Sequence, residues 1–148
     1  MVVSIHWGSS WGYDVGPDQV RFPRRLIGGG VGLIDGHASH HPRPVEVFGG
    51  KLVLSGCGDG INDDEGVAGH ERYRGDLRLL YFASLRPGTG TLAVLRMAPV
   101  QARKRRLRRA AQAGARWPGT VLERAGSRLG SLADLQPDGL LALRSGQS

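Results

Sequence analysis

Two short apolar runs, each leading into a histidine, constrain the fold of this chain more than any other feature. Residues 2–5 are rich in β-branched side chains and precede His6, and residues 31–34 lead to His37. The apolar positions between these runs predict a helix over 17–27. Because a strand, a helix and a second strand typically form a crossover between parallel strands, we expect both histidines at the same edge of one sheet.

The remaining sequence predicts hairpins and a second helix. Pro23 is expected to kink the first helix or delay its start, and the glycines at 28–30 are expected to end it. Beyond it, the glycine- and proline-marked turns predict hairpins, and one further apolar segment predicts a helix. The expected elements are strands at 45–48 and 51–54, strands at 77–85 and 91–100, a helix at 115–129, and a last hairpin turning at 137–139.

Composition indicates the number of domains and the kind of partner, but it does not identify a function. The 148 residues suit one domain, and the net charge of +7 with a pI near 10.7 suggests an anionic partner. The single Cys57 cannot form an internal disulfide, and its glycine neighbours offer no basic group to activate a catalytic thiol. We find no basic leader and no apolar run of about 18 residues, so no signal or membrane segment is expected in this chain and the default localisation is cytoplasmic.

Four of the five histidines gather where predicted strands end. His6 follows the first strand, and His37, His40 and His41 follow the second. Ligands of parallel α/β sheets bind at the carboxyl ends of the strands, and imidazole is a common ligand for zinc, iron and related ions. A metal site is one interpretation. Histidines that only form hydrogen bonds within loops are the other, and spacing alone leaves both open.

The same segments resemble a known family. Residues 2–8, VVSIHWG, resemble the VVSxHWG segment of CapA-type proteins of poly-γ-glutamate and capsule synthesis. Residues 26–42 resemble the family's second histidine motif, and 45–54 with Gly58-Asp59 continue the match. The resemblance implies an α/β fold that forms the C-terminal half of a calcineurin-like metallophosphatase sandwich, followed by a small β-rich tail. It makes 1–148 a single partial CapA-like domain, with the metal motifs in 1–60 and the tail in 61–148.

By resemblance, the site would be a two-metal, phosphoesterase-like centre with zinc, iron or manganese. His6, His37 and His40 would be ligands, with His41 as the alternative if the register shifts by one residue. Glu46 would orient a ligating histidine, or else be an exposed hairpin residue. The family's carboxylate and asparagine ligands come from upstream motifs that this sequence lacks, so an upstream half or another capsule-synthesis protein would have to complete the site. We expect a fragment of a longer parent, which leaves open a remnant without function.

Two charged runs and two aromatics complete the candidates. Six cationic side chains lie in the seven residues 103–109. A solvated face is the expected interpretation of this run, and a non-catalytic site for an anionic polymer is the alternative. Nucleic acid is not expected, because no aromatic is interleaved with the cations. The segment 62–65, Asn-Asp-Asp-Glu, lacks calcium-loop spacing, and a solvated loop is expected there. Trp7 and Trp11 line a substrate cleft or anchor a minor core. The cationic residues are Arg103, Lys104, Arg105, Arg106, Arg108 and Arg109.

Overall fold

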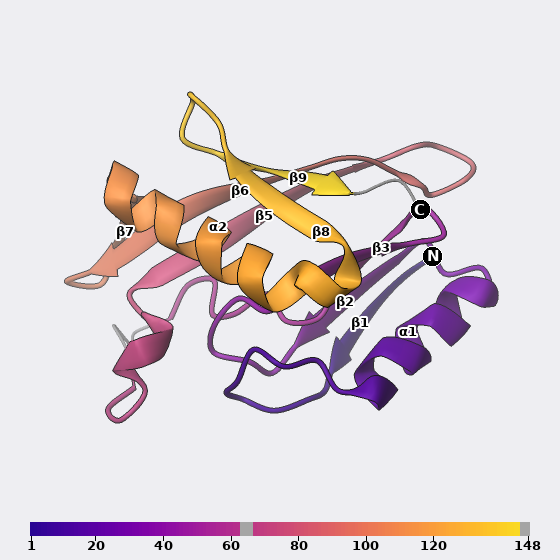
Figure 1. Cartoon of the computed structure of the whole chain (residues 1–148), viewed down its shortest axis with the longest axis horizontal. Helices are drawn as coiled ribbons and strands as arrows, with labels where there is room; N and C mark the ends of the chain where they lie inside the picture. The colour runs from indigo at the N-terminus through magenta and orange to yellow at the C-terminus, as the bar shows by residue number, and fades with distance from the viewer. Residues whose placement is uncertain (63–66, 146–148) are drawn as a thin grey trace.

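The computed structural model describes residues 1–62 and 67–145, which form two β-sheets and two α-helices (Figure 1). The α/β class expected from the sequence is confirmed. Neither α-helix, nor any shorter helix in the described ranges, has the length and apolar character needed to cross a bilayer.

The first sheet, sheet A, contains the predicted crossover. Its strands are β1 (Val2–His6), β2 (Leu33–His37), β3 (Val45–Phe48) and β4 (Lys51–Leu54), in the order β1-β2-β4-β3. β1, β2 and β4 are parallel, and β3 is antiparallel to β4. The β3–β4 hairpin turns at Gly49 and Gly50, both with positive φ, as the paired glycines predict.

Helix α1 (Pro17–Gly28) connects β1 to β2 and covers one face of sheet A. Pro17 occupies the first turn, where its fixed φ favours helix formation and no hydrogen bond is lost. The expectation that Pro23 would delay the start is therefore wrong: Pro23 lies inside the helix with its ring buried. The helix ends in the glycine triplet, as predicted.

The second sheet, sheet B, is antiparallel and follows sheet A in the chain. Its strands are β5 (Leu77–Leu85), β6 (Leu92–Arg103), β7 (Arg106–Arg109), β8 (Ser131–Leu135) and β9 (Leu141–Ser145). The order is β5-β6-β9-β8, and β7 pairs with β6. Helix α2 (Gln112–Gly126) lies between β7 and β8, and short 3-10 turns occur at Glu71–Tyr73 (η1) and Ser127–Leu129 (η2).

The main core lies between sheet A, sheet B and α2. Leu52 of β4, Met97 of β6 and Leu141 of β9 have no exposed surface and belong to one cluster, to which α2 contributes Leu122. A second, smaller cluster lies between sheet A and α1 and centres on Ile34. Sheet A is thus apolar on both faces, which explains its continuous apolar strand sequences.

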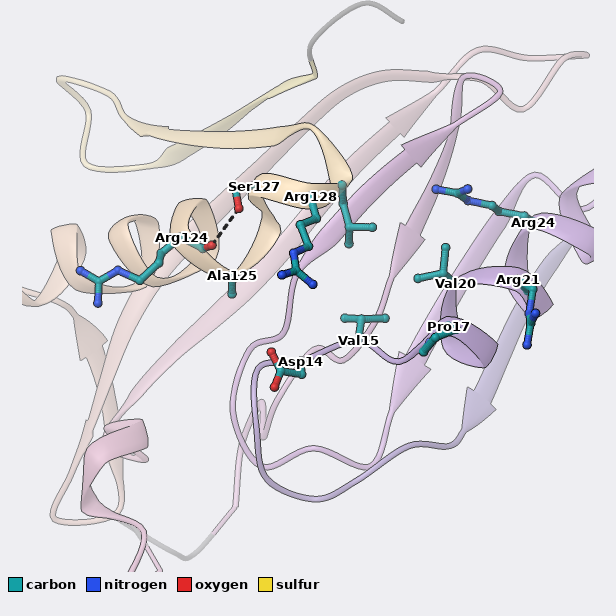
Figure 2. A pocket seen from close by; sticks show the side chains of 11 residues that line it. Asp14, Val15, Pro17, Val20, Arg21, Arg24, Arg124, Ala125, Ser127 and Arg128 are labelled. Carbon is teal, nitrogen blue, oxygen red and sulfur yellow. Dashed lines mark hydrogen bonds between the residues drawn. The ribbon is translucent and has the colours of Figure 1, made fainter.

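Apart from the cores, α1 and the end of α2 border a groove (Figure 2). Its volume is about 870 Å³, and its walls are the segment before α1, α1 itself, the last turn of α2 and η2. No sequence pattern indicates this groove, because its two walls lie about a hundred residues apart in the chain.

Candidate functional site

His6 and His37 come together at the carboxyl ends of β1 and β2. They are register partners in the parallel ladder, and both side chains are exposed. Their Nδ1 atoms lie 3.3 Å apart, and the rings meet edge to face with centroids 5.2 Å apart. The pairing follows directly from the crossover, which places the ends of both strands at the same edge.

The spacing of these nitrogens suits two alternative contacts. Two ligands of a tetrahedral zinc ion, each about 2.0–2.1 Å from the metal, lie about 3.3–3.4 Å apart. The measured separation of 3.3 Å matches this value, but it also fits a hydrogen bond between two neutral rings. Within residues 1–62 and 67–145, no three His, Cys, Asp or Glu side chains gather to hold a metal ion. The structure thus brings two imidazole nitrogens together without a third side chain of these types beside them in the described ranges.

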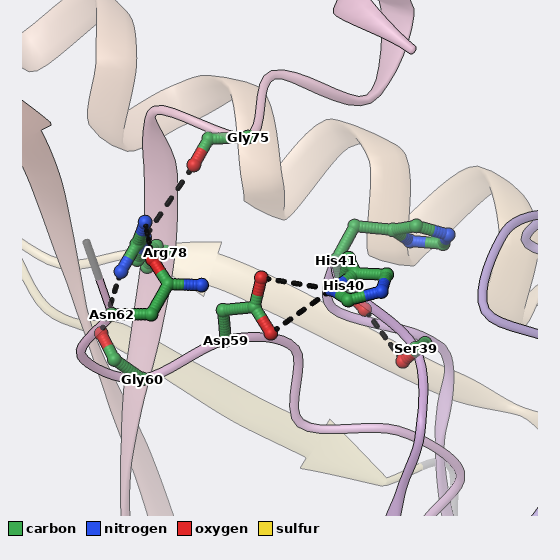
Figure 3. A network of polar contacts seen from close by, with 8 residues as sticks. All are labelled: Ser39, His40, His41, Asp59, Gly60, Asn62, Gly75 and Arg78. Atoms are coloured by element: carbon green, nitrogen blue, oxygen red, sulfur yellow. Dashed lines mark hydrogen bonds and ion pairs between the residues drawn. The ribbon is translucent and has the colours of Figure 1, made fainter. Parts of the chain in front are cut away.

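His40 pairs with an acidic residue from a different loop. Its Nδ1 lies 3.1 Å from Oδ2 and 3.3 Å from Oδ1 of Asp59, which follows β4 (Figure 3). The Trp11 ring lies beside the imidazole, with centroids 5.1 Å apart. Asp59 and Trp11 therefore fix the orientation of an exposed imidazole near the end of β2.

His41, the alternative in the shifted register, has a different environment. Its side chain is 1% exposed, and its Nδ1–H donates a 3.0 Å hydrogen bond to the carbonyl of Pro42. Burial lowers the pKa of this imidazole below its usual value. The structure thus places a neutral His41 in the interior and leaves His40 as the exposed histidine of the two.

A cluster of rings surrounds His41. It stacks on Tyr73 with centroids 4.5 Å apart and meets Tyr13 edge to face at 4.6 Å. Trp11 stacks flat on His70, with centroids 3.9 Å apart and planes within 2°. Trp11 therefore anchors this cluster through ring contacts. His70 was not among the candidates because it lies outside both histidine motifs.

Glu46 is buried, so the exposed-hairpin interpretation is wrong. Its side chain is 5% exposed and forms an ion pair with Arg24 of α1, whose Nε donates a 3.0 Å hydrogen bond to Oε1. Arg24 also lies over the ring of Phe48, 4.8 Å from its centroid. The carboxylate thus ties hairpin β3–β4 to α1.

Trp7 and the segment 62–65 were also named as candidates from the sequence. Trp7 packs on Phe22 of α1, with centroids 5.5 Å apart. Asn62 accepts a 2.6 Å hydrogen bond from the buried guanidinium of Arg78 (Figure 3). The acidic residues at 63–65 lie outside the described residues.

The basic run at 103–109 belongs to a β-hairpin, whereas the sequence had predicted only a solvated face and no strand there. Arg103 ends β6, Lys104 and Arg105 form the turn, and β7 begins at Arg106. Because side chains alternate along a strand and Arg103 is paired with Arg106, these two and Arg108 share one face. Leu107 and Arg109 lie on the opposite face, where Arg109 donates to the carbonyl of Asp138.

Comparison with known proteins identifies the family. The model of the family described as bacterial capsule synthesis protein PGA_cap matches residues 1–64, the part that contains the crossover and the histidine loops. Two strains of Mycobacterium tuberculosis contain a probable polyglutamine synthesis accessory protein that is 46% identical over 140 residues, which is 95% of this chain. The PGA biosynthesis protein CapA of Bacillus subtilis is 30% identical over 94 residues, or 64% of this chain.

These matches cover only part of each relative. The chain spans 37% of the length of the mycobacterial proteins and 23% of the Bacillus protein. The agreement nevertheless includes the histidine motifs and continues through the tail in the mycobacterial relatives, which confirms the resemblance seen in the sequence. The chain belongs to the CapA family of bacterial capsule synthesis proteins.

Proposed function

We propose that this chain takes part in the synthesis of a polyglutamate-type capsule polymer, and that His6 and His37 hold a divalent metal ion of a phosphoesterase-like site. Its membership of a capsule synthesis family supports the first part. If the two histidines hold such an ion, the crossover β1–α1–β2 would be a piece of a calcineurin-like metallophosphatase fold.

The observation that carries the metal site is the 3.3 Å separation of the two Nδ1 atoms. Both rings are exposed at the strand ends, so an ion can reach them without unfolding the sheet. His40, the third histidine that the sequence suggested as a ligand, pairs with Asp59 instead and does not join His6 and His37 in a three-residue cluster of the described structure.

A bound divalent ion would supply Lewis acidity, polarising a phosphoryl oxygen or activating a water molecule. The histidines of this chain hold and orient that ion. Zinc, iron and manganese all accept imidazole ligands. The remaining ligands would come from an upstream half or from another capsule-synthesis protein.

Metal binding by the purified chain tests this proposal. Calorimetric titration with Zn²⁺ and Mn²⁺ should show one ion bound per wild-type chain, weakly because the two histidines fill only part of its coordination shell. Either His6→Ala or His37→Ala should reduce affinity at least about tenfold. His70→Ala is the matched control, because His70 stacks on Trp11 rather than pairing with His6 or His37, and its loss should leave metal affinity unchanged. Absence of metal in the wild type, or equal loss in all three variants, would overturn the metal site.

Binding of an anionic polymer is a second candidate function, favoured by the β6–β7 hairpin. The strand alternation places Arg103, Arg106 and Arg108 on one face, with Lys104 at the turn. These four side chains border a hollow of about 320 Å³. Deleting the 103–109 run would test this function: unchanged affinity for polyglutamate would exclude it, and a loss that is strongest at low salt would support it.

A further inference from the structure

The α1–α2 groove has features that neither the histidine loops nor the basic hairpin share. One side is lined by the segment before α1 and by α1, and the other by Arg124, Ala125, Ser127, Arg128 and Leu129 (Figure 2). Its volume of about 870 Å³ is within the range of small-ligand sites, roughly 300–1,000 Å³. The groove therefore has room for several residues of a flexible chain.

Two of the four arginines in the groove already have acidic partners. Arg24 pairs with the buried carboxylate of Glu46, and Arg21 pairs with Asp18 at 2.6 Å. Arg24 thus contributes its hydrocarbon stem and a neutralised head to the wall. The positive charge available to a ligand comes mainly from the other wall.

That wall presents Arg124 and Arg128, both exposed. Within residues 1–62 and 67–145, no carboxylate lies within ion-pair distance of either guanidinium. Arg128 extends from η2 toward the segment at Asp14 and Val15, whereas Arg124 lies at one end of the groove (Figure 2). An anion bound here would meet an unpaired cation without displacing an internal ion pair.

Apart from the arginines, Asp14 and Ser127, the residues that line the groove are apolar, and none of the lining side chains carries an aromatic ring. Val15, Pro17, Val20 and Leu129 provide aliphatic surface beside the arginines. Single-stranded nucleic acids are bound by positive grooves that also stack bases on aromatic side chains, which this lining does not offer. A chain of carboxylates separated by short methylene segments matches both components, because arginine binds carboxylates in bidentate fashion and aliphatic side chains contact methylenes.

We infer that the α1–α2 groove binds a segment of a polycarboxylate chain, with Arg128 as the main carboxylate-binding residue and Arg124 as a second one. The identity of the ligand rests on the proposed role in polyglutamate synthesis, but the groove is separate from the histidines at the strand ends. The two proposals can therefore fail independently.

Binding of a fluorescent oligoglutamate of about ten residues, followed by anisotropy at 50 and 150 mM salt, tests this inference. Arg128→Gln should weaken binding by about tenfold and Arg124→Gln by less, since each loses a charge-assisted hydrogen bond. Asp14→Asn should strengthen binding, because it removes the negative charge opposite Arg128. Both arginines are exposed, so the substitutions should leave the fold intact, as circular dichroism would verify.

Charge-matched controls separate the groove from general electrostatic attraction. Arg86→Gln and Arg116→Gln remove the same charge from exposed positions outside both the groove and the basic hairpin, and should weaken binding less than Arg128→Gln does. Equal losses in both pairs, or no binding of oligoglutamate by the wild type, would overturn the inference. Tighter, Arg128-dependent binding of an oligonucleotide of equal charge would also overturn it, in favour of nucleic acid. His37→Ala should leave oligoglutamate affinity unchanged, whatever its effect on metal.

Discussion

The thiol of Cys57 donates a hydrogen bond to the carboxylate of Asp35, with 3.2 Å between Sγ and Oδ1. The other carboxylate oxygen of Asp35 accepts a 3.0 Å hydrogen bond from the hydroxyl of Ser4. Burial, together with this hydrogen bond and the charge of Asp35, raises the pKa of the thiol well above its ordinary value. The same contact links β2 to the loop that follows β4.

This thiol should make stability fall at alkaline pH. Above the ordinary thiol pKa of 9.0, the unfolded chain releases the proton while the native chain keeps it, so rising pH favours unfolding. Between pH 8 and 10, the wild type should lose about 1.4 kcal/mol more than Cys57→Ala does. Urea unfolding at both pH values measures this difference. Parallel pH profiles for the two proteins would contradict the assigned thiol environment.

The buried carboxylate of Glu46 should make Arg24 important for stability. Arg24→Ala leaves that charge without its partner and should cost about 2–3 kcal/mol in free energy of unfolding. Arg21→Ala on the same helix breaks only an exposed ion pair with Asp18 and should cost less than about 1 kcal/mol. Denaturant unfolding of both variants provides the comparison. Equal costs would mean that the Arg24–Glu46 pair contributes no more than a surface pair.

Gly36 allows β2 and β4 to approach each other beside the paired histidines. A Cβ at this position would lie 2.5 Å from the carbonyl oxygen of Leu54 and 3.1 Å from that of Ser55. Gly36→Ala should therefore separate the strands, cost about 3 kcal/mol and displace His37. Thermal unfolding checks the first effect and zinc titration the second.

Gly28 supplies the control for that substitution. It ends α1, and a Cβ there would meet no atom within 4 Å. Gly28→Ala should leave stability unchanged or raise it by up to about 1 kcal/mol. A Gly36→Ala protein as stable as Gly28→Ala would exclude the close strand contact.

The turn of the basic hairpin should store backbone strain. Lys104 and Arg105 have φ values of 50° and 57°, in the left-handed region that Asn and Gly adopt more readily. Replacing the pair by Asn-Gly should raise the free energy of unfolding by about 1 kcal/mol. Arg106→Asn, placed in β7, should lower it because Asn is disfavoured in strands. A fall in melting temperature with Asn-Gly would contradict the turn geometry.

The sequence predicted those elements whose signals are local. The crossover and the β3–β4 hairpin follow from apolar runs of strand length and from glycines that end a helix or form a turn. Strand β7 was not predicted. Six cations in the seven residues 103–109 leave no alternation of apolar and polar side chains, and the turn before β7 contains no glycine. Pairings between distant segments depend on packing, so the parallel contact of β4 with β2 was not predicted.

The site was predictable to the same extent. His6 and His37 follow strands that the crossover makes parallel, so their proximity could be anticipated. Asp59 could have been found as the partner of His40 only if β4 had been recognised as a third parallel strand. The burial of Glu46 depends on Arg24, 22 residues away on a helix face. No local pattern contains that information.

In sheet B, β9 lies between β6 and β8 although it follows both in the chain. During synthesis, β5, β6 and β7 can pair as they emerge, because they are consecutive and antiparallel. β8 cannot pair until β9, its only strand partner in the described structure, has been synthesised. Until then the buried position of Leu141 in the core is unfilled. A nascent chain that ends before β9 therefore leaves the part of α2 around Gly119, which packs on Leu141, open to chaperones and proteases.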